Sequence, residues 1–412
     1  MIARLILPAG AERTALPILA GRGLRAFADG YVAVLLPAYL LALGFGSLEV
    51  GFISTATLIG SALATVAVGS FGHRFQQRRL LLAAALLMAA TGLCFAGLSA
   101  FWPLVVVAFV GTLNPSTGDV SMFLPLEHAR LAEAATGEAR TALFARYTLA
   151  GSLCGAIGAL AAAVPEWLSV HGSLAHLASL RVMFVAYGVI GALVWLLYRR
   201  IPERHAEIAL TPAPLGPSRP IVLKLAALFS VDAFAGGLMV NSLLALWLFQ
   251  RFGMSLSAAG IFFFGAGLLT AVSQLIAPVI ARHIGLINTM VFTHIPSSIC
   301  LILAALAPNV ELALGLLFLR AALSQMDVPT RSAFVMTVVT PAERAAAASF
   351  TAVPRSLAAS VSPSLGGALL SAGALATPLI ACGVLKIAYD LALLFSFRHY
   401  EDENSIISRR TG

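Results

Sequence analysis

Hydrophobic stretches separated by short polar segments run along almost the whole chain. Each stretch is close to the roughly 20 residues that a helix needs to cross the hydrocarbon core of a bilayer. The pattern therefore predicts an all-α membrane protein with twelve transmembrane helices. We expect these helices at 24–44, 48–71, 79–100, 102–127, 140–163, 179–198, 221–250, 256–281, 289–307, 310–337, 344–371 and 376–397.

A charged, proline-rich segment, IPERHAEIALTPAPLGPSRP, stands out between the sixth and seventh stretches. Such composition is typical of a linker. The segment predicts four parts: an N-terminal six-helix half, a cytoplasmic linker, a C-terminal six-helix half and a cytoplasmic tail, at 1–198, 199–220, 221–397 and 398–412. An offset of about 208 residues relates the halves, since Arg146 then falls near Arg355. The sequence thus predicts two six-helix pseudo-repeats, an arrangement typical of secondary transporters.

Composition supports a membrane location, because only 11% of the 412 residues are charged and 59% are hydrophobic. Soluble proteins carry about 25% charged residues. The net charge of +8 comes from Arg residues in the loops of one side, which the positive-inside rule assigns to the cytoplasm. We therefore expect a multi-pass inner-membrane protein with both termini in the cytoplasm and no nucleic-acid partner.

Cofactor chemistry finds no support in the sequence. The four cysteines lie far apart inside apolar stretches, which indicates neither a zinc site nor a disulfide framework. The chain also lacks a GxxxxGK[ST] loop for nucleotide phosphates. We expect no cofactor, no metal site and no direct use of ATP.

The loop after the second stretch, GSFGHRFQQRRLL, resembles the loop motif of the major facilitator superfamily. Its matching positions include Gly69, Arg74 and Arg78, with Arg79 beside them, whereas His73 replaces the family's Asp. A degenerate copy, ARHIGLIN, contains Arg282 in the second half. The resemblance implies the twelve-helix fold and secondary transport. In the family this Asp helps to lock the halves together on the cytoplasmic side, and a His would do so only weakly.

The first stretch, from Asp29–Gly30–Tyr31 to Pro37, looks like the first helix of tetracycline-type efflux pumps, which are bacterial drug exporters. The likeness implies a proton-coupling role for Asp29, and by the repeat also for Asp232. The alternative is that Asp29 only neutralises Arg25, four residues earlier on the same helical face. The run SPSLGG at 362–367 resembles the Gly-Pro motif of drug–proton antiporters, and close helix packing through small residues is the alternative.

Charged residues inside a bilayer cost about 2.5–3.5 kcal/mol each on insertion scales, so each needs a partner or an aqueous cavity. Spacing predicts ion pairs within Asp327–Arg331 and within Lys386–Asp390. We also expect Arg355 to pair with Asp327. The predicted substrate cavity, lined by the first, fourth, fifth, seventh, tenth and eleventh helices, contains Asn114, Asp119, Arg146, Asn241, Asp327, Arg331 and Arg355.

Proline positions suggest breaks in three helices. Asn114–Pro115 and Pro125 predict one in the fourth, Pro329 one in the tenth, and Pro354 with Pro363 one in the eleventh.

These features favour a monomeric secondary transporter that moves a small solute by alternating access, with proton-coupled export as the leading hypothesis. Uptake or uniport of a nutrient is one alternative. Export of a metal ion, with Asp29 and Asp232 as oxygen ligands, is another. An integral-membrane enzyme is disfavoured, because Glu127–His128 is the only suggestion of a catalytic pair.

Overall fold

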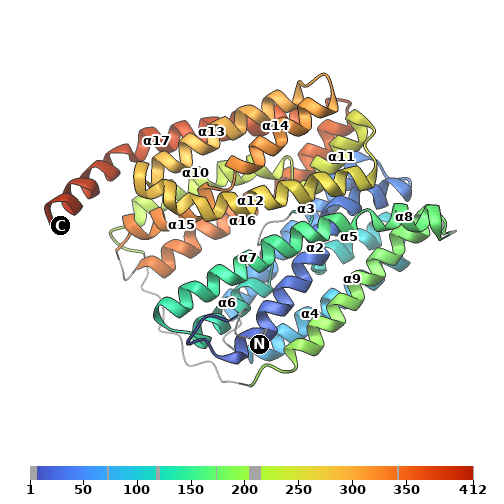
Figure 1. The fold of residues 1–412 in the computed structure, drawn as a ribbon, viewed down its shortest axis with the longest axis horizontal. Coiled ribbons are helices and arrows are strands. Elements are labelled where there is room, and N and C mark those ends of the chain that lie inside the picture. The colour runs from blue at the N-terminus through green and yellow to red at the C-terminus, as the bar shows by residue number, and fades with distance from the viewer. Residues whose placement is uncertain are drawn as a thin grey trace. The chain divides into compact units, whose positions relative to one another are not determined.

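The computed structural model describes residues 7–71, 74–116, 121–172, 174–203, 215–340 and 343–411, and all regular elements within them are helices (Figure 1). The first part contains η1 Arg13–Ala15, α2 Leu16–Ala42, α3 Ser47–Phe71, α4 Gln77–Gly97, α5 Phe101–Val110, α6 Phe123–Ala134, α7 Gly137–Ala161, α8 Val164–His171 and α9 His176–Tyr198. The second contains α10 Arg219–Gly237, α11 Asn241–Phe252, α12 Leu256–Ile284, α13 Leu286–Ala305, α14 Val310–Leu323, α15 Asp327–Val338, α16 Arg344–Ser371 and α17 Thr377–Thr411.

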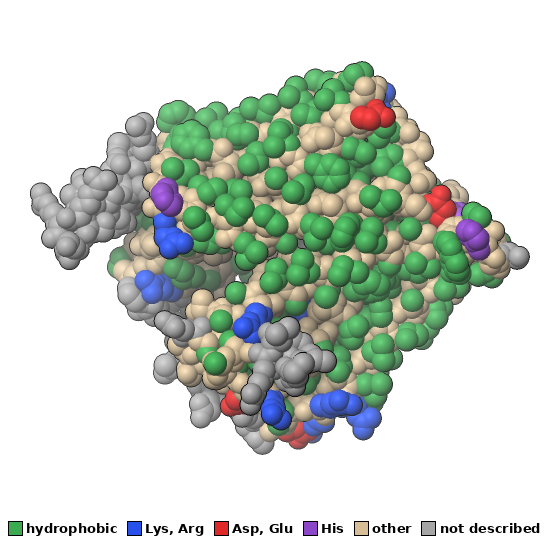
Figure 2. Space-filling model, in the orientation of Figure 1, with side chains coloured by type: hydrophobic (Ala, Val, Ile, Leu, Met, Phe, Trp, Pro, Cys, Tyr) green, Lys and Arg blue, Asp and Glu red, His purple; other side chains and the backbone are tan. Residues whose placement is uncertain are grey.

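Ten of the described spans are long and apolar enough to cross a membrane. The two remaining predicted spans correspond to the α5–α6 pair and to α16. The prediction of an all-α, twelve-helix membrane protein is therefore confirmed. On the face shown in Figure 2, hydrophobic side chains far outnumber charged side chains, as contact with lipid requires.

The chain forms two compact units. The first comprises Met1–Ala209 and Val240–Phe264, and the second comprises Leu210–Met239 and Gly265–Gly412. The segment Val240–Phe264 thus packs with the first unit, although it follows the linker in sequence.

Hydrogen bonds attach the segment Val240–Phe264 to the rest of the first unit. The backbone N–H of Ser242 donates to the Pro115 carbonyl over 3.1 Å, and the Ser242 and Ser54 hydroxyls lie 3.1 Å apart. At the start of α12, the backbone N–H of Ser257 donates to the Glu166 carboxylate over 2.9 Å. These contacts explain why α11 and the start of α12 belong to this unit.

Glycines allow close helix packing in the first unit, where α2 and α7 lie side by side (Figure 1). A Cβ on Gly30 would overlap the Gly155 carbonyl, and one on Gly158 would overlap the Phe27 carbonyl. Small residues let membrane helices approach this closely, where van der Waals contact replaces the hydrophobic driving force.

In the second unit, a glycine likewise allows close packing of α10 against α16. A Cβ on Gly237 would overlap the Ser362 hydroxyl and the Ala359 carbonyl. The alternative interpretation of SPSLGG, close helix packing, is therefore confirmed at Ser362.

Three of the predicted spans are interrupted. The fourth breaks between Val110 and Phe123, and the tenth between Leu323 and Asp327, as proline positions predicted. The seventh also breaks, between Gly237 and Asn241, where the proline pattern predicted no break. The break predicted in the eleventh span is wrong, because α16 continues as one helix through Pro354 and Pro363.

Candidate functional site

The first unit contains a fully buried carboxylate, Glu127 on α6, that is bonded from three other helices. Arg25 on α2 donates to Oε2 over 2.5 Å, and the Tyr147 hydroxyl on α7 donates to the same oxygen over 2.5 Å. The Tyr198 hydroxyl, at the end of α9, donates to Oε1. One carboxylate therefore joins α2, α6, α7 and α9.

Small and aromatic residues shape this cluster. Gly21 leaves room for the Tyr198 ring, since a Cβ there would overlap the ring and its hydroxyl. The Arg25 guanidinium also stacks over the Phe123 ring, 4.0 Å from its centroid. Such a cation–π contact offsets part of the cost of burying a charge.

Asp29 lies one turn beyond Arg25 on α2 and is half-buried. It interacts electrostatically with Arg25, Tyr31 and Tyr187. The close partner of Arg25 is Glu127, however, so Asp29 is not the only carboxylate that neutralises Arg25.

The second unit contains a larger cluster around Asp232 on α10, which is 4% exposed. Lys386 on α17 donates to Oδ1 over 2.6 Å, and Arg331 on α15 donates to Oδ2 over 3.0 Å. Arg331 also pairs with Asp327 over 3.2 Å, which confirms the predicted Asp327–Arg331 pair.

Two other predicted pairs are wrong. Lys386 pairs with Asp232 rather than with Asp390, because another helix brings a carboxylate closer than the neighbour on α17. Asp327 pairs with Arg331, and Arg355 forms no ion pair within 4.0 Å among the described residues, although it interacts electrostatically with this cluster.

The partner of Asp390 is His294 on α13. The ring nitrogen Nδ1 lies 3.0 Å from both Asp390 oxygens, and Nε2 lies 3.3 Å from Lys386 Nζ. Nε2 is also 3.9 Å from Asp232 Oδ1. His294 thus connects Asp390 to the Asp232 cluster. The side chains of His294 and Asp390 are almost inaccessible to solvent.

The remaining predicted cavity residues differ in their surroundings. Asn114 is buried in the break between α5 and α6, where its side chain accepts from the N–H and hydroxyl of Ser116, each over 3.0 Å. Arg146 is half-buried on α7, and Asn241 begins α11 in the first unit. Asp119 lies outside the described residues.

In the predicted loop motif, Arg78 pairs with Glu203 over 2.6 Å and donates to the Arg199 carbonyl over 2.8 Å. The exposed members are Arg74, Arg79 and Arg282, and Gly69 lies near the end of α3. His73 lies outside the described residues. Arg78 therefore ties the start of α4 to the segment that follows α9.

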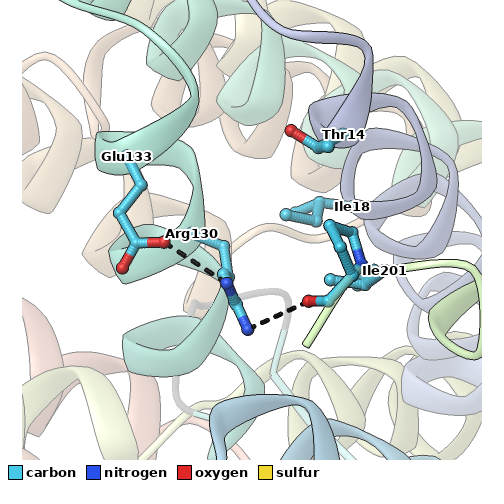
Figure 3. A pocket seen from close by; sticks show the side chains of 6 residues that line it. Thr14, Ile18, Arg130, Glu133 and Ile201 are labelled. Atoms are coloured by element: carbon cyan, nitrogen blue, oxygen red, sulfur yellow. Dashed lines mark hydrogen bonds and ion pairs between the residues drawn. The ribbon is translucent and has the colours of Figure 1, made fainter. Parts of the chain in front are cut away.

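Neither of two cavities is large enough to identify a solute site. One, of about 10 Å³, lies where Arg130 reaches from α6 toward the segment after α9, and it has room for no more than about one water molecule (Figure 3). The other, of about 230 Å³, is lined mainly by apolar groups of α12, α13 and α15 and also by Arg282 of α12. Ligand pockets typically measure about 300–1,000 Å³.

Two features of these clusters were not predicted from the sequence. Glu127 stands at the end of a predicted span, where the only signal is the weak Glu127–His128 catalytic pattern. His294 lay inside the ninth span, where an ionisable side chain is already a signal of function. The tyrosines around Glu127 carried no such signal, because tyrosine is common in membrane helices.

Comparisons with known proteins agree with this architecture. A family profile described as Major Facilitator Superfamily matches residues 18–319. An uncharacterized membrane protein of Saccharomyces cerevisiae, YJR124C, is 25% identical over 411 residues, covering 91% of this chain and 92% of the yeast protein.

Solved structures of transporters are also similar. A bacterial homologue of the iron transporter ferroportin is 16% identical, with a TM-score of 0.72, covering 93% of this chain and 98% of its own. A D-xylose–proton symporter is 16% identical, with a TM-score of 0.70 and coverages of 92% and 96%. At such identities the likeness supports the fold, whereas the profile, which spans more than half of the sequence, supports the family. This chain belongs to the Major Facilitator Superfamily and is a multi-pass membrane transporter of solutes.

Proposed function

We propose that the protein is a proton-coupled, efflux-type antiporter that exports a small neutral or cationic organic solute by alternating access. It works as a monomer in the inner membrane of a bacterium, with both termini in the cytoplasm. The main support is that both units keep carboxylates buried among cations in the membrane region. Such charges are costly in lipid, and transporters use them to carry protons and to bind solutes.

In this proposal Asp29 and Asp232 take part in proton coupling. The substrate contacts come from Asn114, Asp119, Arg146, Asn241, Asp327, Arg331 and Arg355. Asp29 is only half-buried, so protons can reach it more easily than they reach Glu127. The acidic groups on α2 and α10 also disfavour a phosphorylated substrate, since anion exchange would need free cations at these positions.

Transport by purified protein in proteoliposomes tests the proposal. The probes are D-xylose, uridine, tetraphenylphosphonium and Fe²⁺, each offered outside the vesicles with the lumen acidic, with the lumen alkaline, and without a gradient. Antiport predicts accumulation only when the lumen is acidic. Accumulation only when the lumen is alkaline would instead support nutrient symport, equilibration without accumulation would support uniport, and selective movement of Fe²⁺ would support metal export.

Reporter fusions test the topology independently. Fusions after residues 75, 135, 210, 285 and 405 are expected to report the cytoplasm, and those after 170 and 253 the opposite side. A reversed signal at 170 or 253 would contradict the proposed orientation.

A further inference from the structure

We infer that His294 is a proton-binding site of the second unit, and that its protonation changes which residue holds Asp232. The inference rests on the proposed proton coupling and deepens it, because it adds a residue that the sequence pattern did not single out. The evidence for it is the arrangement of hydrogen-bond donors and acceptors around the buried imidazole of His294.

The neighbours of His294 determine where its resting proton lies. Asp390 is fully buried and its two oxygens both face Nδ1 at 3.0 Å, so an ionised Asp390 requires Nδ1 to donate. On the other side, Nε2 lies 3.3 Å from Lys386 Nζ, and an ammonium group can only donate. Nε2 must then accept. The geometry therefore corresponds to a neutral imidazole that carries its hydrogen on Nδ1.

A second proton changes these bonds. It adds to the Nε2 lone pair, so Nε2 becomes a donor and can no longer accept from Lys386. Asp232 Oδ1 lies 3.9 Å from Nε2 and can accept the new N–H after a small movement. The imidazolium would then lie between two carboxylates, and Lys386 would compete with it for Asp232. The proton comes from solvent, so the new N–H bond replaces an O–H bond of a hydronium ion and no other covalent bond changes.

His294 lies among charges of both signs, because Asp390 and Asp232 are acidic whereas Lys386 and, further away, Arg331 are basic. Imidazole binds and releases protons reversibly and is a common proton carrier in proteins. The ionisable groups that face His294 or its immediate partners from the packed helices are Asp232 on α10, Asp327 and Arg331 on α15, Arg355 on α16, and Cys382, Lys386, Tyr389 and Asp390 on α17.

Protonation at His294 acts on α10. Asp232 lies five residues before the end of this helix at Gly237, and the chain then breaks before continuing as α11. A change of partner at Asp232 therefore alters how firmly α17 holds the helix that leads into this break. Protonation of His294 is thereby coupled to the conformation of the chain at the break after α10.

The first test follows the imidazole itself, by ¹⁵N NMR of the full-length protein labelled at histidine. At pH 8 we expect one histidine with a protonated Nδ1 and an unprotonated Nε2, and at pH 5 the same histidine protonated at both nitrogens. These signals should disappear in His294→Gln and remain in His283→Gln, which removes an exposed ring. Asp390→Asn keeps an acceptor for Nδ1 but removes the negative charge beside it, so the hydrogen should stay on Nδ1 at pH 8 and the second proton should bind more weakly. This variant also serves as the second variant if His294→Gln does not fold.

A His294 that carries hydrogen on Nε2 at pH 8, or whose signals do not change between pH 8 and pH 5, would overturn the inference. The second test is transport of whichever of the four probes the wild type accumulates. His294→Gln should lower accumulation to the level without a gradient while leaving exchange of labelled for unlabelled probe intact, and wild-type accumulation by this variant would also overturn the inference. If the wild type itself accumulates no probe, the proposed proton coupling fails, whereas the NMR result still decides whether His294 binds a proton.

Discussion

Glu127 and Asp232 are both buried carboxylates, and cations from other helices compensate each of them. In the first unit α2 supplies the cation and α6 the carboxylate, as Arg25 and Glu127. In the second unit the order is reversed, since α10 supplies Asp232 and α15 supplies Arg331. Corresponding helices of the two halves are thus joined by an ion pair in each unit, but the helix that supplies the carboxylate in one supplies the cation in the other.

At Glu127 we expect removal of one charge to be worse than removal of both. Glu127→Gln leaves Arg25 buried without its counter-charge, which typically costs about 3–5 kcal/mol. The double variant Glu127→Gln with Arg25→Gln should recover part of this loss. Thermal unfolding of the detergent-solubilised proteins measures the difference, and a single variant as stable as the wild type would show that Arg25 relies on other partners.

At Asp29 we expect a functional effect with little structural cost. Asp29→Asn mimics the protonated carboxyl permanently, so solute exchange should continue while accumulation driven by a pH gradient is lost. Asp29→Glu should retain partial coupling, because the carboxylate remains at a displaced position. Since Arg25 is held by Glu127, the Asn variant should unfold near the wild-type temperature, and gradient-driven accumulation by this variant at the wild-type rate would exclude Asp29 from the mechanism.

The close packing of α2 against α7 can be tested by a substitution at Gly158. Gly158→Ala places a methyl group against the Phe27 carbonyl, so the helices must separate. Overpacking of this kind typically costs about 1–3 kcal/mol. Gly315→Ala is the matched control, because its added Cβ would meet no atom within 4 Å among the described residues beyond its own stretch of helix. It should leave the unfolding temperature unchanged or raise it slightly, and equal effects of both substitutions would argue against tight packing at Gly158.

A polar contact outside the membrane spans joins α10 to α16. Glu343, at the start of α16, accepts from the backbone N–H groups of Gly216 and Ser218 and from the Thr340 hydroxyl over 2.8 Å. Hydrogen bonds from Ser218, Gly216 and Thr340 lower the pKa of Glu343 from 4.5 to about 2. The carboxylate form is therefore the one that stabilises the folded state.

The pH dependence at Glu343 follows from this lowered pKa. Its contribution to stability is fully present above about pH 4.5 and is lost as the pH falls toward about 2, because the unfolded chain takes up the proton first. Glu343→Gln should accordingly lower the unfolding temperature at pH 7, and the gap from the wild type should narrow on acidification. Glu311→Gln, at an exposed carboxylate on α14, is the matched control. If the difference in unfolding temperature between Glu343→Gln and the wild type stays constant from pH 7 to pH 3, the pKa of Glu343 is not lowered as described.

For the whole molecule, the sequence predicted the number and order of the helices because lipid imposes a simple length and hydrophobicity requirement on each of them. It also predicted that Asp327 and Arg331 share a face and pair. It did not predict that Lys386 reaches Asp232, or that Arg25 reaches Glu127. Spacing along one helix says which residues share a face, but it does not say which neighbouring helix brings the nearest charge.

The segment Val240–Phe264 has a consequence for how this chain can be built. Because the segment packs in the first unit, the polypeptide passes from one unit to the other three times, after Ala209, after Met239 and after Phe264. Each unit is therefore assembled from two stretches of chain that are not consecutive in sequence, much as a subunit of a domain-swapped dimer includes an element from elsewhere. A fragment of residues 1–209 made alone lacks partners for Ser54 and Glu166, so we expect rapid degradation of that fragment in cells. Coexpression with residues 210–412 should rescue it as a copurifying complex, and a stable, monodisperse 1–209 fragment would show that the segment Val240–Phe264 is dispensable.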